Sequence, residues 1–137
     1  DADRDLAGRR PRCSALDWRV AREDLLVLTA EWRRDGIWPP DMVVFADCTY
    51  TEEVWRPLLS VLEHLCQLVR EEATEGEGFE VHFTHQERRG GNFEGFLEEL
   101  RGRGFFEIEE LPTEDLDPGC IFYPPRRFHL FVLRLRS

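Results

Sequence analysis

The sequence predicts an α/β fold in which a mostly parallel sheet ends in a terminal antiparallel β-hairpin. Short strand-like runs alternate along the chain with stretches of helical periodicity. One of these runs, Asp41–Asp47, is almost entirely apolar, which is typical of a strand in a parallel sheet. The last two strand-like runs are joined by the Pro-, Asp- and Gly-rich stretch 112–127 and no helix, which favours antiparallel pairing. We expect one domain over residues 1–137.

The N-terminal part predicts a helix end, a strand and a helix. Residues 1–8 are typical of a helix that Gly8 closes, and the alternating run Arg12–Trp18 that follows predicts a short strand. From Arg22 to Arg34, apolar residues recur three or four positions apart, which indicates a helix before the breaker Pro39-Pro40.

The middle of the chain predicts a strand and a long helix. Asp41–Asp47 (DMVVFAD) is rich in β-branched and aromatic residues, so we expect a central strand buried on both faces. An amphipathic helix follows, with its apolar stripe at Val54, Leu58, Leu62, Leu65 and Val69. Because proline cannot lie deep inside a helix, Pro57 predicts that the regular part begins near Arg56.

The C-terminal part predicts three strands and one helix. Phe79–Thr84 alternates apolar and polar residues, as a strand does. Apolar residues at helical spacing between Phe93 and Leu100 indicate a helix that ends at the glycines of positions 102–104. Phe105–Leu111 alternates again, and Phe128–Arg136 is the last strand.

Composition excludes several function classes. The net charge of -10 argues against nucleic acid as a partner and favours a basic protein segment. No apolar run approaches the roughly 20 residues that span a bilayer, so we expect no membrane partner. Residues 1–10 are too charged for a signal sequence, and we expect a protein of the cytoplasm, with the nucleus as a further location. The cysteines have no zinc-finger spacing, so we expect no metal: Cys13, Cys48, Cys66 and Cys120.

Two predicted strands end in residues suited to a binding site. Ligands of open α/β sheets lie beyond the carboxyl ends of the strands. The first strand ends in Leu-Asp-Trp at Trp18, and the second ends in Ala-Asp-Cys-Thr-Tyr over residues 46–50, which adds a carboxylate and a phenol. His82 and His85 lie three apart on a strand and therefore point to opposite faces, as surface or core histidines would.

Each of these residues also has an ordinary structural explanation. Trp18 could be a half-buried core residue, and Tyr50 could serve in packing. Asp47 could satisfy free N–H groups at the start of the next helix. Thr49 and Glu52 have the spacing of a capping box, which favours that second explanation. Their joint occurrence at two successive strand ends favours a functional site.

The residues at these strand ends resemble a known family. The Leu-Asp-Trp ending, the segment ADCTY, the helix LLSVLEHLC and the run QERRGGNFEGFLEEL are together similar to seven-strand, S-adenosylmethionine-dependent protein-lysine methyltransferases. The nearest types act on non-histone proteins such as valosin-containing protein and heat-shock protein 70. The resemblance covers nearly the whole chain and implies a Rossmann-like methyltransferase sheet, of which this chain would supply strands 3 to 7. The family's strand order is 3-2-1-4-5-7-6.

The resemblance also implies roles for individual residues. Trp18 would lie against the adenine of the cofactor S-adenosylmethionine, and Ala46 would line the same pocket. Asp47 and Tyr50 would be the catalytic pair on the side of a lysine-bearing protein substrate. A carboxylate attracts and orients the ammonium group, and an aromatic ring packs on its stem and cation. Methyl transfer depends largely on such positioning.

The cofactor-binding segment of the family has no counterpart before Trp18. No Gly-x-Gly precedes this residue, and the glycines of 76–78 and 102–104 lie in the wrong half of the chain. We therefore expect a partial domain that is inactive and binds the cofactor weakly or not at all by itself. Asp41–Asp47 would be a sheet edge with unpaired backbone groups, so either Arg12–Trp18 folds back to cover it, or the chain associates with a second copy or a partner, or the fold is unstable; we favour association or instability. Two hypotheses remain, part of a protein-lysine methyltransferase or a catalytically inactive interaction module on the same fold.

Overall fold

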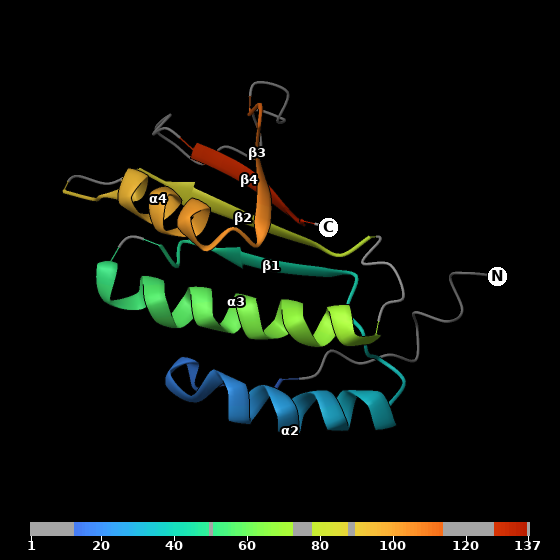
Figure 1. Cartoon of the computed structure of the whole chain (residues 1–137). Helices are drawn as coiled ribbons and strands as arrows, with labels where there is room; N and C mark the ends of the chain where they lie inside the picture. Colours follow the sequence, from blue (N-terminus) through green and yellow to red (C-terminus); the bar gives the residue numbers. More distant parts are fainter. Residues whose placement is uncertain (1–12, 50, 73–77, 88–89, 114–127, 137) are drawn as a thin grey trace.

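A computed structural model describes residues 13–49, 51–72, 78–87, 90–113 and 128–136. The predicted helix and strand elements from Arg22 onward are all present, in the expected order (Figure 1). They are the 3-10 helix η1 (Trp18–Val20), α2 (Ala21–Arg34), β1 (Met42–Ala46), α3 (Glu52–Glu72), β2 (Glu80–Gln86), α4 (Phe93–Arg103), β3 (Phe106–Leu111) and β4 (Phe128–Leu135). The helix end expected over residues 1–8 and the linker 114–127 lie outside the described residues.

The four strands form one mixed sheet in the order β1-β2-β4-β3. β1 and β2 are parallel, with Val43 opposite Val81. β4 is antiparallel to both of its neighbours, so β1, β2 and β3 point one way and β4 points the other. This confirms the α/β class, the terminal antiparallel pair, and the expected order of these four strands.

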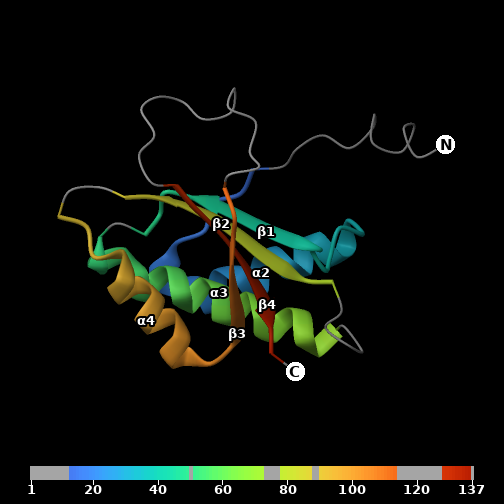
Figure 2. The same ribbon diagram turned by 90° about the horizontal axis from the view of Figure 1, so that it is seen from above.

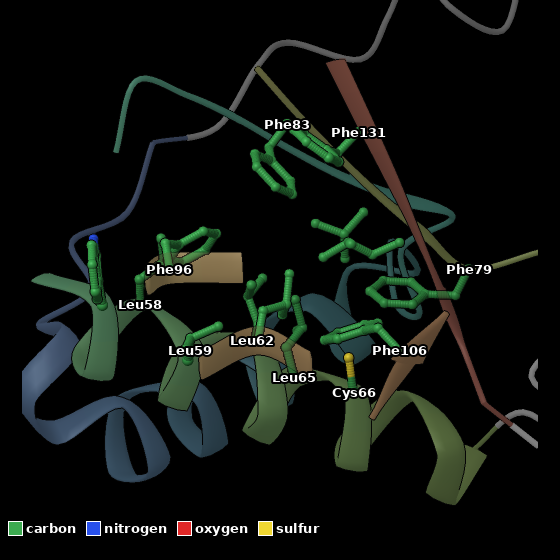
Figure 3. Close-up of a cluster of buried hydrophobic side chains, with 14 of the residues drawn as sticks. Leu58, Leu59, Leu62, Leu65, Cys66, Phe79, Phe83, Phe96, Phe106 and Phe131 are labelled. Carbon is green, nitrogen blue, oxygen red and sulfur yellow. The ribbon is translucent and has the colours of Figure 1, made fainter. Parts of the chain in front are cut away.

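All three helices cover one face of this sheet (Figures 1 and 2). α3 lies in the middle and contacts both α2 and α4. The residues of α3 that Figure 3 labels point toward the sheet: Leu58, Leu59, Leu62, Leu65 and Cys66. Trp55, Val61 and Val69 are buried as well, so one stripe of the helix is apolar, as the sequence predicts. The core therefore lies between this stripe and the helix-facing side chains of the strands.

Phe83 of β2 is at the centre of an aromatic cluster in this core (Figure 3). Its ring stacks on Phe45 with centroids 4.9 Å apart and on Phe131 with centroids 5.0 Å apart. Phe96 of α4 meets the same ring edge-on at 5.9 Å. These contacts tie three adjacent strands and one helix together.

β1 is an edge strand, and its outer edge pairs with no other described strand. The prediction of a strand buried on both faces was wrong, because no described helix covers the second face (Figure 2). There Met42 is 48% exposed and Val44 is 70% exposed. The other large exposed apolar residues of the described chain lie on other elements or loops: Val20, Leu26, Val27, Ile37 and Phe128.

The strand predicted over Arg12–Trp18 was wrong for the described residues 13–17, which form no strand. Asp17 instead caps η1, since its side chain accepts a hydrogen bond from the backbone N of Arg19 at 2.9 Å. Leu16 and Trp18 pack against the core instead of alternating across a sheet. An alternating run becomes a strand only where a neighbouring strand can pair with it, and none of the described strands lies there.

The start of α3 also differs from the prediction, because the helix begins at Glu52 and includes Pro57. Pro57 is close enough to the start to cost only the bond to the carbonyl of Glu53, a residue exposed to water. Burial of Trp55 and Leu58 on either side of the proline stabilises this first part of the helix.

Candidate functional site

The carboxyl end of β1 turns sharply at Asp47. This residue has φ 53, in the left-handed region that aspartate tolerates better than most residues. Its backbone N donates to the carbonyl of Thr84 at 3.2 Å, and its Oδ1 accepts from the backbone N of Gln86 at 3.4 Å. Asp47 is therefore held at the end of both parallel strands, and its carboxylate accepts a hydrogen bond from β2.

Thr49 follows two residues later and is completely buried. Its exposed fraction is 0%, and its Oγ1 lies 2.8 Å from Nδ1 of His85, which is 2% exposed. Its carbonyl accepts a hydrogen bond of 2.7 Å from Nε1 of Trp55. The alternative explanation of Thr49 as part of a capping box does not hold, because α3 begins three residues later and the hydroxyl pairs with His85 of β2 instead.

His85 connects this loop with the start of α4. Its ring stacks on Phe93 with centroids 3.8 Å apart and planes at 6°. Asn92 caps α4 by accepting from the backbone N of Gly95 at 3.1 Å, and its Nδ2 donates to Oε1 of Glu52 at 3.3 Å. The starts of α3 and α4 therefore meet beside the loop that follows β1.

His85 and His82 point to opposite faces of β2, as their spacing predicts. His85 is on the buried, helix-facing side, and His82 pairs with Val44 and Val132 on the other side. The prediction of core or surface histidines is confirmed. The sequence did not reveal that His85 would contact Thr49, since 36 positions separate the two residues.

A second histidine, His129, lies nearby at the start of β4. Its Nδ1 is 2.6 Å from Glu110 and its Nε2 is 2.9 Å from Glu87. Burial opposes the charged imidazolium, but the hydrogen bonds with the two carboxylates outweigh it and raise the pKa of His129. A cavity of about 280 Å³ opens here, and His85 and Phe93 belong to its walls.

The turn that carries Trp18 lies at the same end of the molecule. Figure 1 shows the start of α2, which directly follows this turn, below the start of α3 and the carboxyl end of β1. Trp18 is half-buried against the core.

Hydrogen bonds from the side chain and the backbone N of Arg19 lower the pKa of Asp17 to about 2.

The structure describes some of the expected site residues but not all of them. Trp18, Asp47 and the exposed Ala46 lie at strand or helix ends on one end of the molecule. Tyr50 lies outside the described residues. The 280 Å³ cavity and a larger one of about 870 Å³ between α3 and α4 are lined by other residues.

The described residues hold neither a metal-binding cluster nor a membrane-spanning helix. They contain no group of three or more His, Cys, Asp or Glu side chains that could hold a metal ion. No helix among them is both long and apolar enough to cross a membrane.

Comparison with known proteins does not identify a family. No protein-family model matches the sequence, and no curated protein is significantly similar to it. The structure shows an α/β fold with a four-strand mixed sheet. Membership of the methyltransferase family stays a prediction.

Proposed function

We propose that this chain is the substrate-side part of an S-adenosylmethionine-dependent protein-lysine N-methyltransferase that acts on a non-histone protein. The observation that carries this proposal is the strand order β1-β2-β4-β3, with β4 alone reversed. It corresponds to the block 4-5-7-6 of the Rossmann-like methyltransferase sheet. Fold alone does not define activity, so the proposal also rests on the residues at the end of β1.

The position of Asp47 supports the proposed role of a substrate-side carboxylate. It follows the carboxyl end of a parallel strand, where ligands of open α/β sheets bind, and its backbone is held by β2. In the proposed role its carboxylate attracts and orients the lysine ammonium, and the ring of Tyr50 packs against the lysine stem. S-Adenosylmethionine, when bound, supplies the methyl group.

The outer edge of β1 is where the rest of the proposed sheet would pair. Its backbone N–H and C=O groups meet no described strand, and Val44 is 70% exposed beside it. Unpaired edges and contiguous apolar surface mark places where a further strand binds. A segment that contains the family's first strand and Gly-rich turn would cover this edge and place that turn next to Ala46 and Trp18.

The test is a methyl-transfer assay on a longer polypeptide in which the sequence encoded in frame upstream precedes this chain. All 18 Lys and Arg residues here are arginine, so radiolabel cannot enter a lysine of this chain, and the substrate is separated from the longer polypeptide on a gel before the label is counted. We expect Asp47→Asn to lower kcat roughly a hundredfold. Asp41→Asn removes the same charge next to the opposite end of β1 and should leave kcat unchanged. Equal kcat in both variants would contradict the assignment of Asp47.

The exposed edge also favours a second candidate, a catalytically inactive interaction module on the same fold. In that case the outer edge of β1 would bind a strand of a partner protein or of a second copy. The longer polypeptide would then form a stable complex whose assembly depends on the Met42–Ala46 strand, without transfer of radiolabel. The same preparation therefore separates the two candidates.

A further inference from the structure

The loop after β1 is fixed at a single buried residue. Thr49 is held twice, by the 2.8 Å contact of its hydroxyl with His85 and by the 2.7 Å hydrogen bond from Trp55 to its carbonyl. All three side chains are buried, so water cannot replace either bond while the protein is folded. The stack of His85 on Phe93 fixes the orientation of the imidazole ring.

Asp47 needs such support. Its φ of 53 is a conformation that a non-glycine residue adopts at a cost, and it persists only where the surroundings enforce it. The backbone N of Asp47 donates to the carbonyl of Thr84, whereas the contact between its Oδ1 and the backbone N of Gln86 is long, at 3.4 Å, and therefore weak. Thr49 is only two residues away, at most about 7 Å along the chain, so fixing Thr49 restricts the positions that Asp47 can take.

We infer that His85 is a positioning residue for the candidate site, and that its hydrogen bond with Thr49 sets the position of the Asp47 carboxylate. His85 would fix the conformation of the loop after β1 whatever reaction the candidate site performs. The consequence for methyl transfer rests on the proposed function. Trp55 and Phe93 support the pair from α3 and α4, so the site is braced by both helices that follow the parallel strands.

The reactivity of Cys48 measures how firmly the loop after β1 is held, and it can be measured in this chain without any added segment. Cys48 lies between Asp47 and Thr49, is half-buried, and its thiol donates to the carbonyl of Ala46 at 3.2 Å. Cys13 is exposed and serves as the fast reference within the same molecule. Cys66 is buried, and burial raises the pKa of its thiol to about 12, so its protection reports that the fold is intact.

Three variants test the pair, with iodoacetamide labelling read by peptide mass spectrometry. Thr49→Val removes the hydroxyl at constant shape, and His85→Phe keeps a planar ring for Phe93 but removes the hydrogen bond. We expect each to raise the ratio of Cys48 to Cys13 labelling about tenfold while Cys66 stays protected. His85→Asn places an amide atom near the position of Nδ1 and should return the ratio to within about twofold of the parent.

An unchanged ratio in Thr49→Val and His85→Phe, with Cys66 protected, would overturn the inference. If Cys66 becomes reactive, the variant has lost its fold, and His85→Asn then decides. A ratio of Cys48 to Cys13 labelling that stays high in His85→Asn would also overturn the inference. In the longer polypeptide, His85→Phe should lower kcat about tenfold or more and leave the KM for S-adenosylmethionine unchanged. Absence of any methyl transfer by the parent would contradict the proposed function alone, since the labelling ratio still tests the positioning role.

Discussion

Two glycines of α4 give opposite predictions for the same substitution. A Cβ at Gly95 would lie 2.6 Å from Nδ2 of Asn92 and 3.0 Å from the ring of Trp55, whereas one at Gly102 would meet nothing within 4 Å. Inside a helix, alanine is more stabilising than glycine by up to about 1 kcal/mol. Gly102→Ala should therefore raise the free energy of unfolding by a few tenths to about 1 kcal/mol.

At Gly95 this gain is outweighed. Displacing Asn92 weakens the cap of α4, which costs about 1 kcal/mol, and moving the Trp55 ring costs about 1–3 kcal/mol of overpacking. We expect Gly95→Ala to lower the free energy of unfolding by about 1–3 kcal/mol. Urea denaturation of the two variants and the parent measures both values. A Gly95→Ala variant as stable as Gly102→Ala would refute the close packing of α4 on Trp55.

Two more predictions concern His129 and the edge of β1. The pKa of His129 is raised in the folded state, so its contribution to stability is fully present below the unfolded pKa of about 6.5 and is lost as pH rises through the raised value. His129→Gln should therefore lower the urea midpoint more at pH 5.5 than at pH 9, and an equal loss at both would contradict the charged pair with Glu110. Val44→Lys should abolish self-association in sedimentation and change the free energy of unfolding by no more than about 0.5 kcal/mol. The control Val27→Lys puts the same charge on α2 and should leave self-association unchanged. Association that persists in Val44→Lys would show that the chain does not associate through the edge at β1.

Much of the fold could be predicted because its signals are local. The apolar stripe of α3 and the alternation of β2 identify their elements without knowledge of any neighbour. The strand order of β1 to β4 followed from the family resemblance and is confirmed for these strands. The run Arg12–Trp18 misled the prediction because alternation does not reveal whether a partner strand is present.

The candidate site could be predicted only in outline. Asp47 was found because it follows a conspicuous apolar run, whereas the bond between Thr49 and His85 joins segments that the sequence keeps far apart. A capping-box pattern described Thr49 wrongly, because the same hydroxyl can bond a helix start or a buried histidine and tertiary packing decides between them. The alternation of β2 puts position 85 on the same face as Val81 and Phe83, and this is a sequence signal for a buried polar residue at His85.

Binding of S-adenosylmethionine tests the account most directly. Titration calorimetry should detect no micromolar binding to this chain alone, because Trp18 and Ala46 provide only one wall of the pocket. The longer polypeptide with the in-frame upstream sequence should bind the cofactor, and Trp18→Ala should weaken that binding at least tenfold through loss of aromatic contact with the adenine. Micromolar binding by this chain alone, or no binding by the longer polypeptide, would contradict the assignment as the substrate-side part of a methyltransferase.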